Sequence, residues 1–481
     1  MFEQIFKRID HYIWKDAGCD SELDYAEQTS WLLFLKWFDD FEKDKEKIFR
    51  LDGKKYKPTF DKSYHWSSWA VVKKKDGSID HNKNLSGDDL INFINNKLFP
   101  YLGGLKDKSE NLDTIEHKIG IIFSEIKNEI QDGYILRDVL EEVDSLEFRS
   151  DKQKHELSIL YESKIKNMGN AGRTGGQYYT PRPLIRTIVK LVNPKIGETI
   201  YDGACGSGGF LVETYNHIKE NKTLTVSELN KLQTKTIFGK EKKNLAYIIG
   251  LMNMILHGIE VPNIIKTNTL SENIMNFQEK DKVDVILANP PFGGGEQTQI
   301  QQNFPIRTSE TAYLFLQHFI KKLKIGGRAG VIIKNTFLSN DDAILTRKEL
   351  LETCNLTHIL NLPKNVFSVG QKTVVLFFTK GQTTKEIFYY DLKLDRNLGA
   401  TNPLNEEDLS EFSNYFNNKR LSNKSWIVDV KRLDKEKFDL TVKNPKEIDE
   451  VDKRNTKDII LNINDLNKKI DISLNKIKKM L

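Results

Sequence analysis

The sequence predicts an α/β protein with a helical N-terminal domain, a doubly wound and mainly parallel sheet, and a C-terminal helical tail. Three observations support this fold class. Charged stretches with apolar residues at helical spacing fill residues 1–165, short β-branched runs alternate with helical patterns over residues 199–378, and one apolar stripe ends the chain. Alternation of strands with helices is typical of doubly wound sheets. A chain of 481 residues is long enough for two or three domains.

The N-terminal region, residues 1–165, is predicted to be a helical domain. In SWLLFLKWFDDF (30–41) and IGIIFSEIKNEI (119–130), apolar residues recur at the steps that place them on one face of a helix. The region has no alternating strand pattern of comparable length.

Seven short apolar runs are predicted to be the strands of a second domain, residues 166–385. The segments between them look helical, and two of these segments have glycine just past their end. In a sheet of this kind, ligands lie beyond the carboxyl ends of the strands. The runs are TIYD (199–202), TIFG (236–239), NIIKT (263–267), VDVILA (283–288), AGVII (329–333), THILNL (357–362) and KTVVLFF (372–378).

Residues 386–481 are polar, rich in Lys and Asn, and predicted to be an extension that ends in an amphipathic helix. Apolar residues recur there in steps of three and four residues and form one stripe. Such a stripe either packs on its own domain or docks against a helix of a partner. Its members are Ile459, Ile463, Leu466, Ile470, Leu474, Ile477 and Leu481.

Composition excludes several classes of protein. The three cysteines are widely spaced, so we expect no disulfide framework, no zinc cluster and a reducing cytoplasm. The N-terminus has no apolar signal segment, and the longest apolar runs fall short of the ~18 residues that span a membrane. The net charge of +5, from 73 basic and 68 acidic residues, is too small to demonstrate nucleic-acid binding by itself.

A glycine-rich turn follows the first predicted strand in IYDGACGSGGFLVETY (200–215). Asp202 stands at the end of the strand, and a helix follows the glycines, so backbone N–H groups can approach a ligand at a helix N-terminus. The spacing is neither G-x-G-x-x-G nor that of a P-loop, which disfavours the dinucleotide and P-loop interpretations. A simple tight turn stays open as the alternative.

Two polar residues follow the next strands. Glu241, at the end of the second strand, is placed to bind the two hydroxyls of a ribose, although its distance from Asp202 exceeds the usual ~20 residues. The alternative is that Glu241 is a solvated surface acid, because its sequence neighbours are lysines. Asn268 follows the third strand and could hydrogen-bond an adenine ring or cap a turn.

The sequence NPPF, Asn289 to Phe292, ends the fourth predicted strand. Pro290 and Pro291 lack N–H donors and restrict φ, so the chain must leave the sheet in a stiff extended conformation. If S-adenosylmethionine is the ligand and an exocyclic amine the acceptor, the Asn289 and Pro290 carbonyl oxygens can hold the two N–H bonds of the amine. Phe292 can stack on a base turned out of the duplex, and positioning alone can support methyl transfer without a strong base. The alternative is a rigid strand exit.

A glycine-containing loop, KNMGNAGRTGGQYYTPRP (166–183), precedes the sheet. It could be a flexible linker. Its aromatic residues suggest instead that it folds onto another part of the chain.

Together these features resemble the modification (methyltransferase) subunit of type I restriction–modification systems, within the amino-group DNA methyltransferases. The resemblance covers most of the chain and includes the helical N-terminal region. The motifs that carry it are GRTGGQYYTPR (172–182), DGACGSGGFL (202–211), GKE with MNMILHG (239–258), NPPF (289–292), GGRAGVIIKNTFL, and LPKNVFSVGQKTVVLFF (362–378).

The resemblance implies a Rossmann-like doubly wound methyltransferase domain that transfers methyl from S-adenosyl-L-methionine to the N6 amine of adenine in a specific DNA sequence. The sequence departs from the pattern of the family at two positions: Gly203 stands where Pro is common, and Asn268 stands where Asp is frequent. The implied catalytic residues are Asn289, Pro290, Pro291 and Phe292. The implied cofactor-binding residues are Gln177, Tyr178, Tyr179, Thr180, Pro181 and Arg182 over the methionine part, Asp202, Gly206, Ser207, Gly208 and Gly209 at the turn, Glu241 at the ribose, and Asn268 at the adenine.

The motifs leave no gap for the domain of well over 100 residues with which single-chain DNA methyltransferases read bases. The resemblance explains this by a separate specificity subunit, on which the C-terminal helix would dock, and by a third subunit with the motor and nuclease. Two copies of this chain per complex are expected. The alternatives are methylation of a protein glutamine or an RNA amine, and an inactive assembly subunit.

Overall fold

The structure is a computed structural model that describes residues 2–108, 114–147, 151–170, 179–259, 262–367, 371–399, 401–446 and 456–480. It divides into two compact units, Met1–Val442 and Lys443–Leu481. Across the described residues, no helix is both long enough and apolar enough to cross a membrane.

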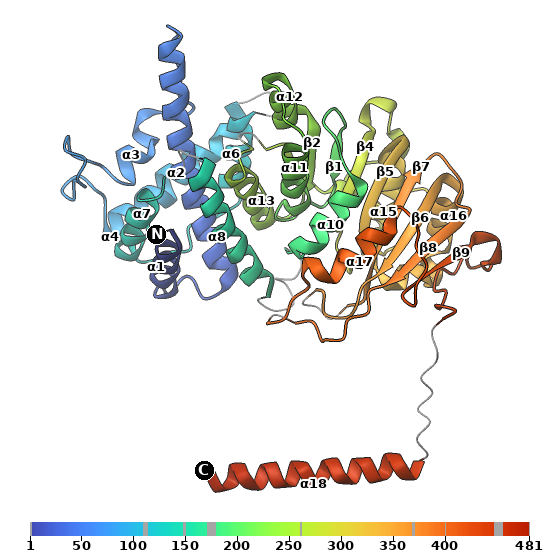
Figure 1. Cartoon of the computed structure of the whole chain (residues 1–481). Helices are drawn as coiled ribbons and strands as arrows, with labels where there is room; N and C mark the ends of the chain where they lie inside the picture. The colour runs from blue at the N-terminus through green and yellow to red at the C-terminus, as the bar shows by residue number, and fades with distance from the viewer. Residues whose placement is uncertain are drawn as a thin grey trace. The chain divides into compact units, whose positions relative to one another are not determined.

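The N-terminal region is helical, as predicted (Figure 1). The long helix α2 starts at a capping box, in which Ser21 accepts from the N–H of Asp24 and the Asp24 side chain accepts from the N–H of Ser21. The last helix of the region, α8, extends past the boundary predicted at residue 165. The helices are α1 (Phe2–Trp14), α2 (Glu22–Leu51), α3 (Trp66–Trp69), α4 (Gly87–Phe93), α5 (Phe99–Gly103), α6 (Ile115–Phe123), α7 (Gly133–Asp144) and α8 (Asp151–Asn170).

One nine-stranded sheet follows, in the order β3-β2-β1-β4-β5-β7-β6-β8-β9. All seven predicted strands are present, and every pair from β3 to β5 is parallel. β7 runs antiparallel between β5 and β6. The strands are β1 (Ile200–Asp202), β2 (Ile237–Glu241), β3 (Ile264–Lys266), β4 (Val283–Ala288), β5 (Leu323–Lys334), β6 (Cys354–Asn361), β7 (Thr373–Lys380), β8 (Glu386–Asp391) and β9 (Ser425–Asp429).

The sheet continues beyond the boundary predicted at residue 385. β8 pairs with β6 and β9 pairs with β8, so residues 386–442 belong to the first unit and not to a polar extension. The reason is a short buried run, Ile387 to Tyr390, between charged residues that dominate the composition of this stretch. The extension is therefore corrected to begin after Val442.

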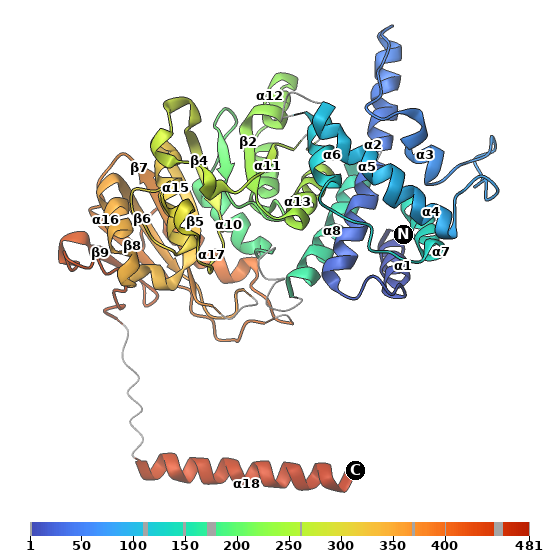
Figure 2. The same ribbon diagram turned by 180° about the vertical axis from the view of Figure 1, so that it is seen from behind.

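Helices cover both faces of the sheet, which confirms the doubly wound class (Figures 1 and 2). Along β4, Val285 and Leu287 belong to one core, and Ile286 and Ala288 belong to the other, because successive side chains of a strand point to opposite faces. The first core is continuous with the N-terminal helices. It receives α10 (Arg182–Val192), α11 (Gly209–Asn221), α13 (Asn244–Leu256) and α17 (Glu406–Phe416), and the second receives α15 (Thr311–Lys322) and α16 (Ile344–Thr353); α12 (Val226–Lys231) and α14 (Thr298–Gln301) are short.

The second unit contains the helix predicted at the end of the chain, α18 (Thr456–Met480). The apolar side chains Ile463, Leu466, Ile470 and Leu474 are each about half exposed. The Ile459, Ile477 and Leu481 side chains lie outside the described residues.

Candidate active site

A cleft at the carboxyl ends of β1 and β4 brings together residues from three distant parts of the sequence. They come from the segment that leads into α10, from the glycine-rich turn between β1 and α11, and from the exit of β4. Of the predicted site residues, the cleft is lined by Thr180, Arg182, Asp202, Gly206, Ser207, Gly209 and Asn289.

The glycine-rich turn is held against α13. Gly206 and Gly208 have positive φ angles, 52° and 74°, which favour glycine. A Cβ on Gly250 of α13 would lie 2.7 Å from the Gly206 carbonyl oxygen, so glycine is also needed on the facing helix. The buried Asn253 side chain donates from Nδ2 to the Ser207 carbonyl oxygen at 2.8 Å. Asn253 belongs to the MNMILHG motif and Gly250 lies just before it, and the motif alone gave no sign of their contact with the turn.

Two buried carboxyl groups stand at this end of the sheet. Asp202 is 2% exposed, and its Oδ1 accepts from the N–H of Ala204 at 3.0 Å. Burial, with a contribution from Glu241, raises the Asp202 pKa to about 8. Burial also raises the pKa of Glu241, whose oxygens accept from the N–H groups of Gly206, Lys242 and Lys243 at 2.8–2.9 Å. At 9% exposure, Glu241 is not a surface acid but a group fastened to the glycine-rich turn.

Asn268 is less directly placed. Its Oδ1 accepts from the N–H of Leu270 at 3.2 Å, which is the turn cap considered as the alternative in the sequence. It does not line the cleft described above. The neighbouring Thr269 hydroxyl donates to the Gly203 carbonyl oxygen at 2.6 Å and ties this turn to the end of β1.

Asn289 leaves one acceptor without a partner. Its Nδ2 donates to the Thr180 hydroxyl at 2.9 Å, and its Oδ1 is buried with no hydrogen bond. Pro290 is buried and Pro291 is exposed. A buried amide oxygen without a donor is costly, so a ligand N–H at this position would be favoured.

Phe292 is half-buried and packs edge-on against Phe367, with ring centroids 5.0 Å apart and planes at 76°. The loop that follows is held by the start of α15, where the N–H and hydroxyl of Thr311 both donate to the Gly294 carbonyl oxygen. Neither Phe367 nor Thr311 was identified from the sequence, since each lies outside NPPF and meets it or its loop only in the folded chain.

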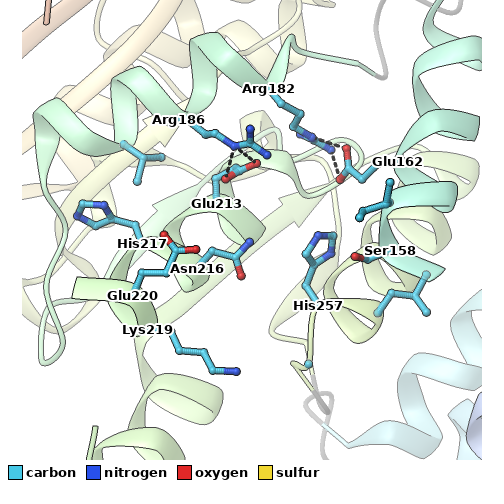
Figure 3. Close-up of a pocket in the computed structure, with 14 residues that line it drawn as sticks. Ser158, Glu162, Arg182, Arg186, Glu213, Asn216, His217, Lys219, Glu220 and His257 are labelled. Carbon is cyan, nitrogen blue, oxygen red and sulfur yellow. Dashed lines mark hydrogen bonds and ion pairs between the residues drawn. The ribbon is translucent and has the colours of Figure 1, made fainter. Parts of the chain in front are cut away.

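The segment before α10 supplies Arg182, whose main partner is an acid of the N-terminal region. Arg182 donates from Nε and Nη2 to the two Glu162 oxygens at 2.5 and 2.6 Å (Figure 3). Its guanidinium also lies 5.7 Å from the Tyr179 ring centroid, and Pro181 immediately precedes α10. Gln177 and Tyr178 lie outside the described residues. Among those described, no group of three or more His, Cys, Asp or Glu residues is suited to a metal ion.

The sequence of the chain is similar to those of known proteins. The family model described as N-6 DNA Methylase matches residues 152–454, a span that contains the glycine-rich turn and NPPF. The methylase subunit of the type I restriction enzyme EcoEI from Escherichia coli is 36% identical over 92% of this chain and 90% of its own length. The chain belongs to the N-6 DNA methylase family, among the methylase subunits of type I restriction enzymes.

Two solved structures extend the similarity to this N-6 DNA methylase as a whole. A chain from a study of complex assembly and conformational transition of the type I R-M system is 34% identical, with a TM-score of 0.81 over 99% of this chain and 97% of that chain. A type I modification subunit from Vibrio vulnificus YJ016 is also 34% identical, with a TM-score of 0.79 over 94% and 98%. The N-6 DNA methylase described here is therefore an adenine-specific DNA methyltransferase of a type I system.

Proposed function

We propose that this methyltransferase uses S-adenosyl-L-methionine and requires a separate specificity subunit to select its DNA sequence. The observation that carries the proposal is the buried, unpaired Asn289 Oδ1 in the cleft that also holds the glycine-rich turn. An acceptor that lacks a donor suits an exocyclic amine, and the turn suits the methyl donor.

The residues around the turn fit the cofactor. Glu241 is fastened by three backbone N–H groups and retains lone pairs for the ribose hydroxyls. Gly206, Ser207 and Gly209 of the turn line the cleft together with Thr180. When bound, S-adenosyl-L-methionine supplies a methyl group on a positively charged sulfur. Asn268 could contribute at the adenine through its Nδ2, because its Oδ1 already caps a turn.

NPPF would bind the target adenine. The Asn289 and Pro290 carbonyl oxygens accept the two N–H bonds of the N6 amine, and this draws the nitrogen lone pair out of conjugation with the ring. Thr180 holds the Asn289 side chain in one orientation. Phe292, supported by Phe367, offers a face on which an extruded base can stack. The amine loses its proton after transfer, so no strong base is required.

The relatives and α18 support the proposed partners. The name of one relative places it in a type I restriction enzyme, and a similar solved chain comes from a study of complex assembly of the type I R-M system. The exposed apolar stripe of α18, Ile463 to Leu474, is suited to a helix of the specificity subunit. We include the motor and nuclease subunit as a further partner, and two copies of this chain per complex.

A methyl-transfer assay tests the proposal. The purified chain, alone and with the specificity subunit encoded beside it, is incubated with tritiated S-adenosyl-L-methionine and with DNA, RNA or protein acceptors. Label in DNA adenine, only when the partner is present, is expected. Label in RNA or in protein glutamine would support the alternative acceptors, and no label in any acceptor would support an assembly role.

A further inference from the structure

We propose that Glu162, in the helical N-terminal region, is a positioning residue for the cofactor site. It holds Arg182 against the glycine-rich turn, where the free guanidinium nitrogen attracts the carboxylate at the amino-acid end of the cofactor. This inference rests on the proposed use of S-adenosyl-L-methionine.

The geometry of the pair leaves one nitrogen of Arg182 unused. Glu162 occupies Nε and Nη2 through both of its oxygens, in the bidentate arrangement that fixes a guanidinium plane. Nη1 is buried and has no hydrogen-bond partner, and Arg182 as a whole residue is only 8% exposed. A Cβ on Gly209 would overlap the guanidinium, so Nη1 lies directly on the residue that starts α11.

The surroundings of Nη1 favour an anion. α11 is a 13-residue helix, and its N-terminal N–H groups carry partial positive charge. A guanidinium nitrogen placed beside them adds positive charge to the same point. A buried N–H without an acceptor is costly, so a ligand that supplies one binds more tightly. The carboxylate is the only negative group of S-adenosyl-L-methionine and of its demethylated product.

Glu162 also makes the helical region part of the cofactor site. It lies on α8, which packs against α13, and α13 in turn holds the Ser207 carbonyl oxygen through Asn253. Arg182 lines both the cofactor cleft and the pocket between α8, α10, α11 and α13 that Figure 3 shows. A displacement of α8 would therefore move the guanidinium relative to Gly209.

The chain offers a matched control one turn further along α10. Arg186 donates from Nε to both oxygens of Glu213 at 3.1 Å (Figure 3). This pair borders the same large pocket but does not line the cofactor cleft. Removing its charge tests the general effect of losing an Arg–Glu pair between these helices.

Isothermal titration of the full-length chain tests whether Glu162 positions Arg182 for the carboxylate of the cofactor or has only a structural role. The ligands are S-adenosylhomocysteine, which has the carboxylate, and 5′-methylthioadenosine, which lacks the amino-acid end. Glu162→Gln is expected to weaken S-adenosylhomocysteine about tenfold and to change 5′-methylthioadenosine less than about twofold, in line with one hydrogen bond to a charged group. Glu213→Gln is expected to change neither. Arg182→Gln should show the same selective loss of affinity for S-adenosylhomocysteine. If Glu162→Gln does not fold, this second variant tests the inference in its place.

Three results would overturn the inference. Equal losses for both ligands in Glu162→Gln would make the residue purely structural. Unchanged affinity for S-adenosylhomocysteine would remove it from the site. If the wild-type chain bound neither ligand, the proposed cofactor itself would be wrong. This failure is distinguishable from a failure of the role proposed for Glu162, because it is seen in the wild-type chain before any substitution is made.

Discussion

Asn289 and Thr180 are joined by a hydrogen bond of 2.9 Å between Nδ2 and Oγ1. The bond connects the exit of β4 to the segment before α10 across more than 100 positions of sequence. Because Nδ2 is occupied, Oδ1 has a defined direction and remains unpaired. The amide is thus held ready to accept a hydrogen bond before any ligand binds, which reduces the reorganisation that catalysis would require.

Asn289→Ala is expected to lower kcat by a factor of about 100 or more, because it removes an acceptor that acts on the reacting amine. The affinity for S-adenosylhomocysteine should stay within several-fold of wild type. Single-turnover methylation of cognate DNA and isothermal titration measure the two effects.

A milder variant completes this test. Thr180→Val keeps the Asn289 oxygen but releases its orientation, and the expected loss of kcat is about five- to tenfold, the size of one neutral hydrogen bond. An Asn289→Ala enzyme with wild-type turnover would exclude NPPF from the mechanism.

Phe292→Ala should weaken productive binding of the target base. Stacking of one base on an aromatic ring contributes about 1–3 kcal/mol, so we expect KM for cognate DNA to rise about tenfold or more. The fluorescence of 2-aminopurine at the target position reports base extrusion in the presence of the specificity subunit. Phe292→Tyr retains the ring and serves as the control. Equal fluorescence in the Ala and Tyr variants would show that the ring does not hold the base.

The sheet and the turn were predictable because their signals are local. Seven strands are recognisable in the sequence as β-branched runs, and the glycine-rich turn is contiguous with the strand and the helix that it connects. β8 and β9 were missed because Ile387 to Tyr390 form a short buried run within a charged stretch. The antiparallel insertion of β7 between β5 and β6 depends on packing, and no local pattern encodes it.

The candidate site divides in the same way. NPPF and Glu241 follow strands, so topology alone places them at one end of the sheet. Glu162 and Phe367 could not be identified, because a surface-type acid in a helix and a phenylalanine in a loop gain their roles only from partners distant in sequence. Asn268 could be placed at a strand end from the sequence, but its role could not be chosen there, because a residue at that position can bind a ligand or cap a turn, and its Oδ1 caps a turn.

The free energy of unfolding should decrease as pH rises because of Asp202. Burial raises its pKa to about 8 in the folded chain, whereas its ordinary value is 3.8. Between these values the folded chain keeps a proton that the unfolded chain has released. The free energy of unfolding therefore falls by at most about 1.4 kcal/mol for each pH unit. Asp202→Asn cannot titrate, so its stability should fall less than that of wild type between pH 5.5 and 7.5 in urea unfolding.

Asp284→Asn is the control for this pH dependence. The Asp284 carboxylate accepts from the Thr199 N–H and from Lys324; burial opposes ionisation, but these bonds outweigh it and hold the pKa below its usual range. Its stabilising contribution is complete above about pH 4, so this variant should lose a similar amount at both pH values. A wild-type slope equal to that of Asp202→Asn would mean that Asp202 is ionised in the folded chain.

Arg347 should be the strongest single anchor of the segment that ends the first unit. Its side chain is fully buried and donates to the carbonyl oxygens of Phe337 and Asn340 near the end of β5, and of Lys437 and Phe438 near the end of the unit. Arg347→Ala leaves buried carbonyl groups without donors, and we expect a loss of about 3 kcal/mol or more in the free energy of unfolding. Lys348→Ala, at the exposed neighbouring position of α16, should change it by less than about 0.5 kcal/mol. Limited proteolysis is a second measurement. The Arg347→Ala chain should be cut after residue 430 faster than wild type. Equal cutting of the two chains would show that other contacts are sufficient to hold this segment, such as the hydrogen bond from the Tyr389 hydroxyl to the Leu440 carbonyl oxygen.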